Sequence, residues 1–269
     1  MSPSRDGTVG ALLHGLAVLD MFTQDRPVVG IGEVARQLGV HRSTASRLAS
    51  TLATAGYLEP AGEQGRYRLT AKLAVLGAVA VAGDEVRNAA LPPLRELVSR
   101  LGETGHLGVL DGTEAVTVAV VDGWQTVRMH SWVGKRSPAH CSSLGKALLA
   151  GLSPAELAAR YPDPELPAST PNTITGRDEL EKCLADVRDS GYAEDREELE
   201  PHLCCVAAPV FARDGTVTAS VSLSGPASRM LVPGTMAAVA AEVRATARLA
   251  SLRLGAPTTP WHPATHSPP

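Results

Sequence analysis

The sequence has few aromatic residues, few cysteines and no long hydrophobic run. Aromatic residues make up 3% of its 269 residues, so the core must be built from aliphatic side chains. Its four cysteines show no spacing typical of a disulfide framework. No apolar run reaches the ~18 residues that a membrane-spanning helix needs, and the N-terminal residues lack a signal-peptide pattern. We therefore expect a reduced, cytoplasmic globular protein with two domains or one large one.

The chain also lacks an overall positive charge. Its formal net charge is −3, which by itself argues weakly against nucleic-acid binding. Residues 1–75, however, contain eight Lys/Arg and six Asp/Glu, whereas the remainder contains 17 and 22. The N-terminal part is therefore the net-positive part, and a local excess of positive charge is what contact with a polyanion requires.

Residues 31–57 have the pattern of two helices separated by a glycine. The first helix, 33–38, is followed by Gly39, which tolerates the positive φ of a tight turn. The second helix is predicted over 41–55, because apolar residues recur there at spacings of three and four. The predicted buried stripe is Ala45, Leu48, Leu52 and Ala55.

The opposite face of the second helix has hydroxyl groups and arginines and no acidic residue. A predicted β-hairpin, 57–59 with 67–69, follows it. Two helices and a hairpin in this order predict a winged helix-turn-helix, whose second helix enters the DNA major groove while the wing contacts phosphates. A small helical subdomain with a solvated face is the alternative. The predicted DNA-binding residues are Arg42, Ser43, Thr44, Ser46, Arg47, Arg66 and Arg68.

Two further helices flank this unit. Residues 9–22 place Leu12, Leu16, Leu19 and Phe22 at helical spacing and predict a supporting helix, after a loose arm at 1–8. Residues 71–82 predict a nearly uncharged helix, too short for a bilayer and too apolar to stand in water. We expect this helix to pack against a partner, namely a second copy of the chain.

From residue 104 onwards the pattern changes to short strands with helices between them, which predicts an α+β domain. The predicted strands are 106–110, 115–121, 127–131, 192–196, 203–211 and 217–224. The predicted helices, which begin with 85–101 before the first strand, are 143–150, 154–160, 177–190 and 228–254. The tail 255–269 contains five prolines and is predicted to be disordered.

A ligand pocket is predicted where two of these strands pair. Strands 203–211 and 217–224 are joined by an Asp-Gly turn, so we expect them to be antiparallel, with Cys205, Ser222 and Ser224 on one face. Serines on such a face need hydrogen-bond partners, and a polar ligand is one candidate, backbone or water the other. We expect free N–H groups at Gly145 and Lys146. Walls that are small, hydroxyl-rich and non-basic favour a small organic acid.

The set of motifs in this order resembles the IclR family of bacterial transcription regulators, over most of residues 9–252. In the first half the similar segments are Glu33-Val34-Ala35, Leu38-Gly39, Arg42-Ser43-Thr44, Arg47-Leu48, Gly56-Tyr57 and Arg66-Tyr67-Arg68-Leu69. In the second half they are His140–Ala147, Pro171–Thr175, Gly191–Glu198, Cys205–Val210 and Ser224-Gly225-Pro226. Between Thr44 and Arg47 of the predicted recognition helix this chain has Ala45-Ser46, where many relatives have a larger residue. The base preference of those relatives therefore cannot be transferred to this chain.

The resemblance implies a winged helix-turn-helix at 9–70, a linker helix at 71–84 and a GAF-like effector-binding domain at 85–254. It implies a homodimer or homotetramer on double-stranded palindromic operator DNA, with a small effector that alters operator affinity and repression as the expected outcome. No cofactor and no metal is implied. The positions that match the family's effector site are Ser143, Leu144, Asp195, Leu203, Cys205, Ser222 and Ser224.

Three other kinds of site use residues of the second half of the chain. Gly145-Lys146 is not a phosphate-binding loop, because His140 and Ala147 stand where such a loop needs Gly and Ser or Thr. A cysteine hydrolase would use Cys205 or Cys141 with His140 as base and Asp195 to orient it, but no oxyanion motif is evident. A metal-sensing regulator is the last alternative, with candidate zinc ligands at His140, Cys141, His202, Cys204 and Cys205.

Overall fold

The computed structural model describes residues 9–257, apart from 24, 63, 83 and 84. The chain divides into two compact units, Met1–Gly83 and Asp84–Pro269, each with its own hydrophobic core. The predicted arm at 1–8, the last two residues of the predicted linker and most of the predicted tail lie outside the described residues. Of that tail, Ala256 is described and buried.

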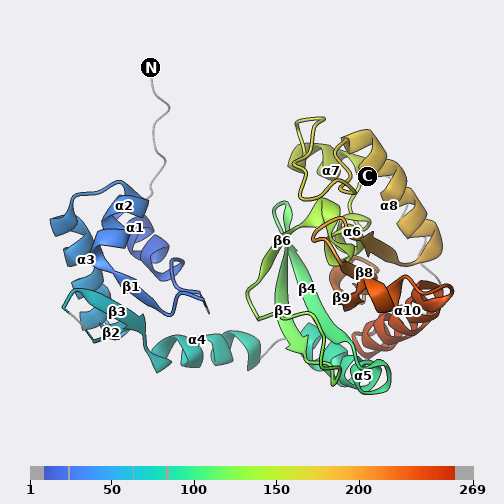
Figure 1. Ribbon diagram of the computed structural model, residues 1–269, viewed down its shortest axis with the longest axis horizontal. Helices are drawn as coiled ribbons and strands as arrows, with labels where there is room; N and C mark the ends of the chain where they lie inside the picture. Colours follow the sequence, from blue (N-terminus) through green and yellow to red (C-terminus); the bar gives the residue numbers. More distant parts are fainter. Residues whose placement is uncertain (1–8, 24, 63, 83–84, 258–269) are drawn as a thin grey trace. The chain divides into compact units, whose positions relative to one another are not determined.

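The first unit contains three packed helices, a small sheet and a following helix (Figure 1). Its helices are α1 (Gly10–Leu19), α2 (Ile31–Leu38), α3 (Arg42–Thr54) and α4 (Ala71–Ala82). Its strands β1 (Val28–Gly30), β2 (Leu58–Pro60) and β3 (Arg66–Leu69) form an antiparallel sheet in the order β1-β3-β2. The predicted hairpin is thus confirmed, and β1 is an additional strand that was not predicted.

Local backbone chemistry fixes the turn between α2 and α3. Gly39 ends α2 with a φ of 63°, and the N–H of Val40 donates to the carbonyl of Ala35 at 3.1 Å. His41 then begins α3, because its Nδ1 accepts from the N–H of Ser43 at 3.3 Å. The glycine predicted to make the turn therefore does so.

Fewer apolar side chains are buried in this unit than their helical spacing predicts. In α3, Ala45 and Ala49 are buried, whereas Ala55 follows the helix and is exposed, so its prediction as a buried residue was wrong. In α1, Leu12 is 61% exposed and Leu16 is 50% exposed. A three-helix unit with a three-stranded sheet has too little interior to cover both sides of α1.

The second unit is built on one antiparallel sheet of six strands in the order β6-β5-β4-β9-β8-β7. The strands are β4 (Thr104–Asp111), β5 (Glu114–Val121), β6 (Arg136–Pro138), β7 (Ala193–Arg196), β8 (Leu203–Phe211) and β9 (Val217–Pro226). The helices are α5 (Glu85–Leu101), α6 (Ser143–Leu149), α7 (Pro154–Arg160), α8 (Arg177–Ser190), α9 (Ala227–Met230) and α10 (Thr235–Arg253), with a short 3₁₀ turn η1 (Ala139–Cys141) before α6. Within the described chain no helix is long and apolar enough to cross a membrane.

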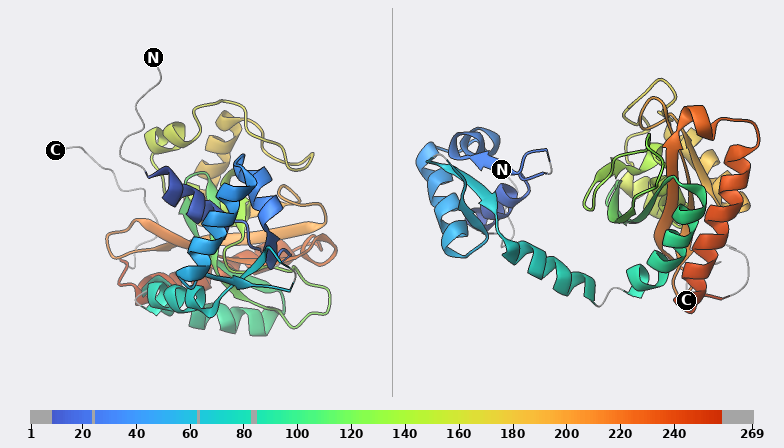
Figure 2. Two further views of the ribbon diagram at one scale, coloured as in Figure 1. Left: turned by 90° about the vertical axis from the view of Figure 1, so that its left-hand side faces the viewer. Right: turned by 60° about the horizontal axis from the view of Figure 1, so that its bottom comes forward.

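Helices cover both faces of this sheet. Figures 1 and 2 show α5 and α10 side by side against one face, where Val206, Val221 and Leu223 join their core. Helix α6 packs on the opposite face, towards which Ser222 and Ser224 of β9 point, because side chains alternate along a strand. One face of the central strands is therefore aliphatic and the other is polar.

Glycines allow α6 to lie close to the sheet. A Cβ added to Gly108 of β4 would come within 2.0 Å of Leu144 Cδ2, and one added to Gly145 within 2.2 Å of Ala139 Cα. Glycine is required at 145, because the clash there is with backbone, whereas a side chain at 108 would force the Leu144 side chain to shift.

Two predicted elements differ from the structure. Residues 127–131 form no strand, and the edge strand is β6 instead. The carbonyl of Met129 accepts from the Thr104 hydroxyl at 3.0 Å, so this segment is a loop bound by a side chain to the first residue of the central strand β4. The single helical region predicted at 228–254 is divided into α9 and α10, because Gly234 has a φ of 84° and interrupts the helix.

Candidate functional site

The surface of α3 presents the residues predicted to contact DNA. Arg42, Ser43, Thr44 and Arg47 are exposed and Ser46 is partly exposed, while Ala45 and Ala49 face the core. No acidic residue lies on α3 itself. Within the part of the chain that the structure describes, Arg42 and Arg47 have no ion-pair partner. Both guanidinium groups are therefore available to phosphates or to guanine edges.

The two wing arginines differ from each other. Arg66 and Arg68 are both exposed on β3, two residues apart, and so project from the same face of the small sheet. Arg68 Nε lies 2.6 Å from Glu59 Oε1, on the neighbouring strand. Glu59 partly offsets the charge of Arg68, so the net contribution of Arg68 to phosphate binding should be smaller than that of an unpaired arginine.

A cavity of about 40 Å³ lies in the second unit, between the polar face of the sheet and the N-terminal part of α6. It is lined by six of the seven residues predicted for an effector site, namely Ser143, Leu144, Asp195, Cys205, Ser222 and Ser224. Leu203 is buried on β8 but is not among the lining residues. Sequence reasoning missed the others, which are His106, Ala115, Thr117, Met129, Ser131, Lys135, Ser137, Ser142 and Leu199.

Strand register brings the predicted residues together. Cys205 pairs with Ser224 on β9 and with Asp195 on β7, so the three lie side by side across three strands. The predicted antiparallel pairing of β8 and β9 is therefore confirmed. On the other side of β9, Ser222 pairs with His106 of β4, a contact between residues 116 positions apart.

His106 is the main polar residue that the sequence analysis overlooked. Its Nδ1 lies 3.4 Å from the hydroxyl of Ser222 and 3.5 Å from that of Ser224. Its Nε2 has no hydrogen-bond partner within the described residues. Burial, together with the positive charge of Lys135, lowers the pKa of His106 to about 4. The imidazole is therefore neutral at pH 7, with one nitrogen open to a ligand.

The two carboxylate oxygens of Asp195 differ in their hydrogen bonds. Its Oδ1 accepts from the N–H of Glu198 at 2.8 Å and from that of Leu199 at 3.4 Å, while Oδ2 has no partner within the described chain. Burial raises the pKa of Asp195 to about 7, although both N–H groups oppose this. One oxygen thus fixes the segment after β7, and the other remains for a ligand.

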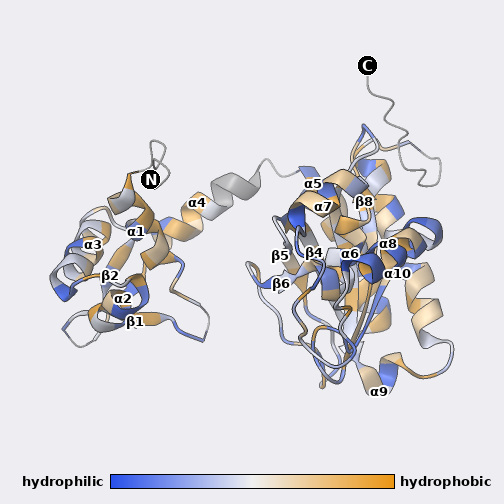
Figure 3. Cartoon of the chain, turned by 90° about the horizontal axis from the view of Figure 1, so that it is seen from above, coloured by the Kyte–Doolittle hydropathy of each residue, from blue (hydrophilic) through white to orange (hydrophobic). Residues whose placement is uncertain are grey.

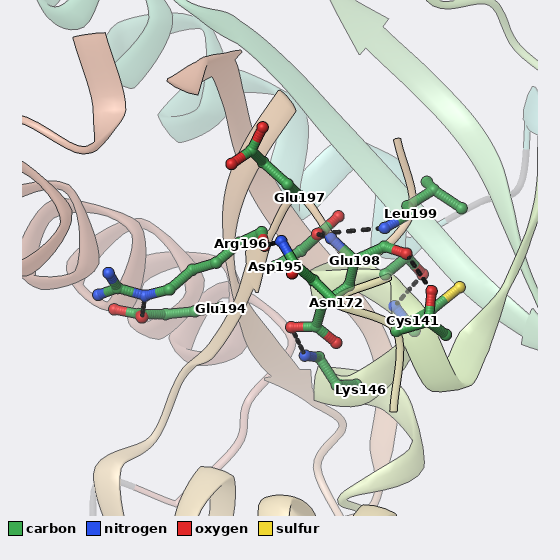
Figure 4. Close-up of polar contacts among 12 residues, drawn as sticks. Cys141, Lys146, Asn172, Glu194, Asp195, Arg196, Glu197, Glu198 and Leu199 are labelled. Atoms are coloured by element: carbon green, nitrogen blue, oxygen red, sulfur yellow. Dashed lines mark hydrogen bonds and ion pairs between the residues drawn. The ribbon is translucent and has the colours of Figure 1, made fainter. Parts of the chain in front are cut away.

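A network of polar contacts holds that segment in place (Figure 4). Lys146 of α6 is buried and its Nζ lies 2.5 Å from Glu198 Oε1. The hydroxyls of Thr170 and Thr173 donate to the carbonyls of Glu197 and Glu198, both at 2.7 Å. Glu197 needs such support because its φ is 61°, which is unfavourable for a residue other than glycine.

Two expectations about the cavity were wrong. The N–H groups of Gly145 and Lys146 are not free, because the first donates to the Ser142 hydroxyl at 3.2 Å and the second to the Ser142 carbonyl at 2.9 Å. The walls are not free of basic residues either, because Lys135 lines the cavity. Lys135 lies in a loop between β5 and β6, and no local pattern in the sequence indicates that it lines the cavity.

The structure does not favour the hydrolase or zinc alternatives. Burial raises the pKa of Cys205 well above its ordinary value and also raises that of Cys141, so neither is an activated thiolate. Cys204 faces the core on the opposite side of β8 from Cys205, and His202 is almost fully exposed. The described residues contain no cluster of three or more His, Cys, Asp or Glu that could hold a metal ion.

A winged helix-turn-helix with free arginines on its recognition helix, joined in one chain to a domain with a polar cavity, defines a ligand-responsive DNA-binding regulator. Residues 11–62 match the model of the IclR helix-turn-helix domain, and residues 78–252 match that of the bacterial transcriptional regulator IclR C-terminal domain. The chain belongs to the IclR family of transcription regulators. It is thus a DNA-binding regulator with a GAF-like effector-binding domain, and not an enzyme.

Individual relatives agree with this assignment. The HTH-type transcriptional regulator XynR of Escherichia coli is 37% identical over 217 residues, which cover 81% of this chain and 86% of that protein. The transcriptional repressor IclR of the same organism is 32% identical over 226 residues, covering 83% and 82%. The crystal structure of an IclR homolog from Microbacterium hydrocarbonoxydans, complexed with 4-hydroxybenzoate, has a TM-score of 0.79 at 26% identity, covering 91% and 98%.

Proposed function

We propose that this protein is a cytoplasmic transcriptional repressor whose affinity for a palindromic operator changes when a small organic acid binds the cavity beneath α6. The winged helix comprises residues 9–70, the linker helix 71–84 and the effector domain 85–254. The observation that carries the effector proposal is the gathering of unpartnered polar atoms around one cavity. These atoms are His106 Nε2, Ser131 Oγ and Asp195 Oδ2.

Two relatives support the finer parts of this proposal. The 32% identical Escherichia coli relative is named a repressor. The Microbacterium homolog was crystallised with 4-hydroxybenzoate, a small hydroxylated organic acid. A ligand of this class has both an anionic group and hydrogen-bonding groups, which suits a cavity with hydroxyls, a neutral imidazole and a lysine.

The function can be tested by selecting DNA from a random duplex pool with the purified full-length protein. We expect enrichment of one inverted repeat, because a two-fold symmetric dimer with one recognition helix per chain reads two equivalent half-sites. A panel of small organic acids should then alter the affinity for that site. Enrichment of no sequence above the starting pool would contradict the proposal.

We also propose that the protein is a homodimer or a homotetramer, joined in part through α1 and α4. Figure 3 shows hydrophobic residues along the described part of α4, and Val75 is 61% exposed. Leu76 of α4 and Leu12 and Leu16 of α1 are exposed as well. Apolar side chains of this size clustered on a small unit favour burial against a second copy.

Val75→Glu/Leu76→Glu is therefore expected to weaken self-association, because it places two charges in an apolar interface. Sedimentation velocity should show a smaller species than the wild-type protein, and operator affinity should fall with it. Val127→Glu/Val133→Glu, at two exposed valines of the second unit, is the matched control. A doubly substituted α4 variant that remains dimeric and binds DNA normally would show that α4 packs elsewhere.

A further inference from the structure

The polar side chains of the cavity form a row across the sheet. Each of five neighbouring strands contributes, and the row ends in an acidic residue at one edge and a basic residue at the other. From one edge to the other the row is Asp195 of β7, Cys205 of β8, Ser222 and Ser224 of β9, His106 of β4, Thr117 of β5 and Lys135 immediately before β6. A carboxyl group therefore lies at one end of the row and an ammonium group at the other.

Lys135 is held at its end of the row by backbone bonds. Its carbonyl accepts from the N–H of Thr117 at 2.9 Å, and the N–H of Gly134 donates to the carbonyl of Thr117 at 2.7 Å. These two bonds attach the end of the 122–135 loop to β5. The side chain contacts Trp132, with Nζ 5.5 Å from the ring centroid, and is only partly exposed. The position of Lys135 is thus determined by the sheet.

The charge of Lys135 is uncompensated. Within the described residues it has no ion-pair partner, and it is the one lysine or arginine among the residues that line the cavity. Its positive charge acts on the cavity, because it helps burial to lower the pKa of His106 and opposes the burial that raises the pKa of Cys205. The neutral His106 cannot balance it, and Asp195 stands at the other edge with Lys146 and Glu198 as its nearest charges. A cation beside a polar cavity favours an anionic ligand.

We propose that Lys135 binds the carboxylate of the effector, while Asp195 Oδ2 and His106 Nε2 bind a hydroxyl group elsewhere on the same molecule. This inference rests on the proposed function and specifies it, since it names a hydroxy-monocarboxylate as the ligand class. A neutral amide lacks the charge that Lys135 requires. An acid without the hydroxyl leaves the buried Asp195 oxygen unpartnered.

The test uses the full-length protein, calorimetry and three hydroxy acids as probes: lactate, 3-hydroxybutyrate and 4-hydroxybenzoate. Each is compared with its amide and with the acid that lacks the hydroxyl. We expect at least one hydroxy acid to bind, and both of its analogues to bind about tenfold or more weakly. Lys135→Met should lower the binding affinity for that acid by about ten- to a hundredfold, because an interaction with a charged group is lost. The affinity for its amide should not change. Lys135→Arg should restore most of the affinity, whereas Lys182→Met, at an exposed lysine of α8, should have no effect.

The outcomes separate this inference from the proposed function. If the acid binds Lys135→Met as tightly as wild type but still alters operator binding, Lys135 is not the anion contact and the effector site stands. If the amide binds as tightly as the acid, the ligand class is wrong. If Asp195→Asn binds the hydroxy acid as tightly as wild type, the hydroxyl assignment is wrong. If none of the probes binds or changes operator affinity, the inference is wrong. The proposal that the effector is an organic acid is then also wrong for the hydroxy-monocarboxylates.

Discussion

Arg42→Ala/Arg47→Ala is expected to abolish specific operator binding while leaving the protein folded. Each arginine that makes a bidentate contact with a base contributes roughly 1–3 kcal/mol, so the double substitution should lower operator affinity by about two orders of magnitude or more. Both side chains are exposed and have no ion-pair partner within the described residues, so their loss should not disturb the core around Ala45 and Ala49.

The measurement is fluorescence anisotropy of a selected operator duplex and of a random duplex at one fixed salt concentration. Arg95→Ala/Arg248→Ala removes two exposed arginines from α5 and α10 and is the charge-matched control. Arg68→Ala should behave differently, because Arg68 is paired with Glu59 and would contact the phosphate backbone. It should weaken both duplexes modestly and equally. If the Arg42→Ala/Arg47→Ala variant keeps the wild-type operator affinity, α3 is not the recognition helix.

Ser222→Ala/Ser224→Ala is expected to separate DNA binding from its control by the effector. Both serines line the cavity and lie in the second unit, whereas the residues predicted to contact DNA lie in the first. Operator affinity without effector should therefore stay near the wild-type value. Two hydroxyl hydrogen bonds of roughly 0.5–1.5 kcal/mol each correspond to about a five- to a hundredfold higher effector concentration for the same change in operator binding.

This prediction needs a check on folding, because both hydroxyls contact Nδ1 of the buried His106. The thermal midpoint of unfolding should accompany the operator titration, and Ser99→Ala, at an exposed serine of α5, is the control. Asp195→Asn is an independent second variant. It retains an oxygen that can accept from Glu198 and Leu199, but replaces the unpartnered oxygen by a donor. Wild-type effector sensitivity in both variants would show that the pocket has been placed wrongly.

Features that depend on neighbouring residues were predictable. Gly39 and the apolar spacing of α2 and α3 predict the helix-turn-helix, because a helix repeats every 3.6 residues and a tight turn needs positive φ. The alternation of Ser222 and Ser224 with Val221 and Leu223 predicts a strand with one polar face. The Asp-Gly turn joins β8 and β9 closely enough to predict their pairing and so the meeting of Cys205 with Ser224.

Features that depend on distant segments were not predictable in this way. Strand β4 lies between β5 and β9, and this sheet order alone places His106 beside Ser222. Lys135 reaches the cavity because a loop without a periodic pattern is bonded to Thr117. The exposure of Leu12 likewise follows from the small size of the first unit, since its apolar spacing predicts burial equally well.

The sequence by itself therefore determined the class of protein, the order of its domains and the residues offered to DNA. It also predicted six residues that the structure brings to one cavity, four of them on strands, where side-chain alternation is a local property. Only the tertiary structure decided how these strands are ordered, that a neutral histidine joins the two serines, and that the cavity has an acid at one edge and a lysine at the other. The physical reason is that hydrogen bonding between strands far apart in the chain sets the order and register of a sheet, and no local periodicity encodes which strands become neighbours.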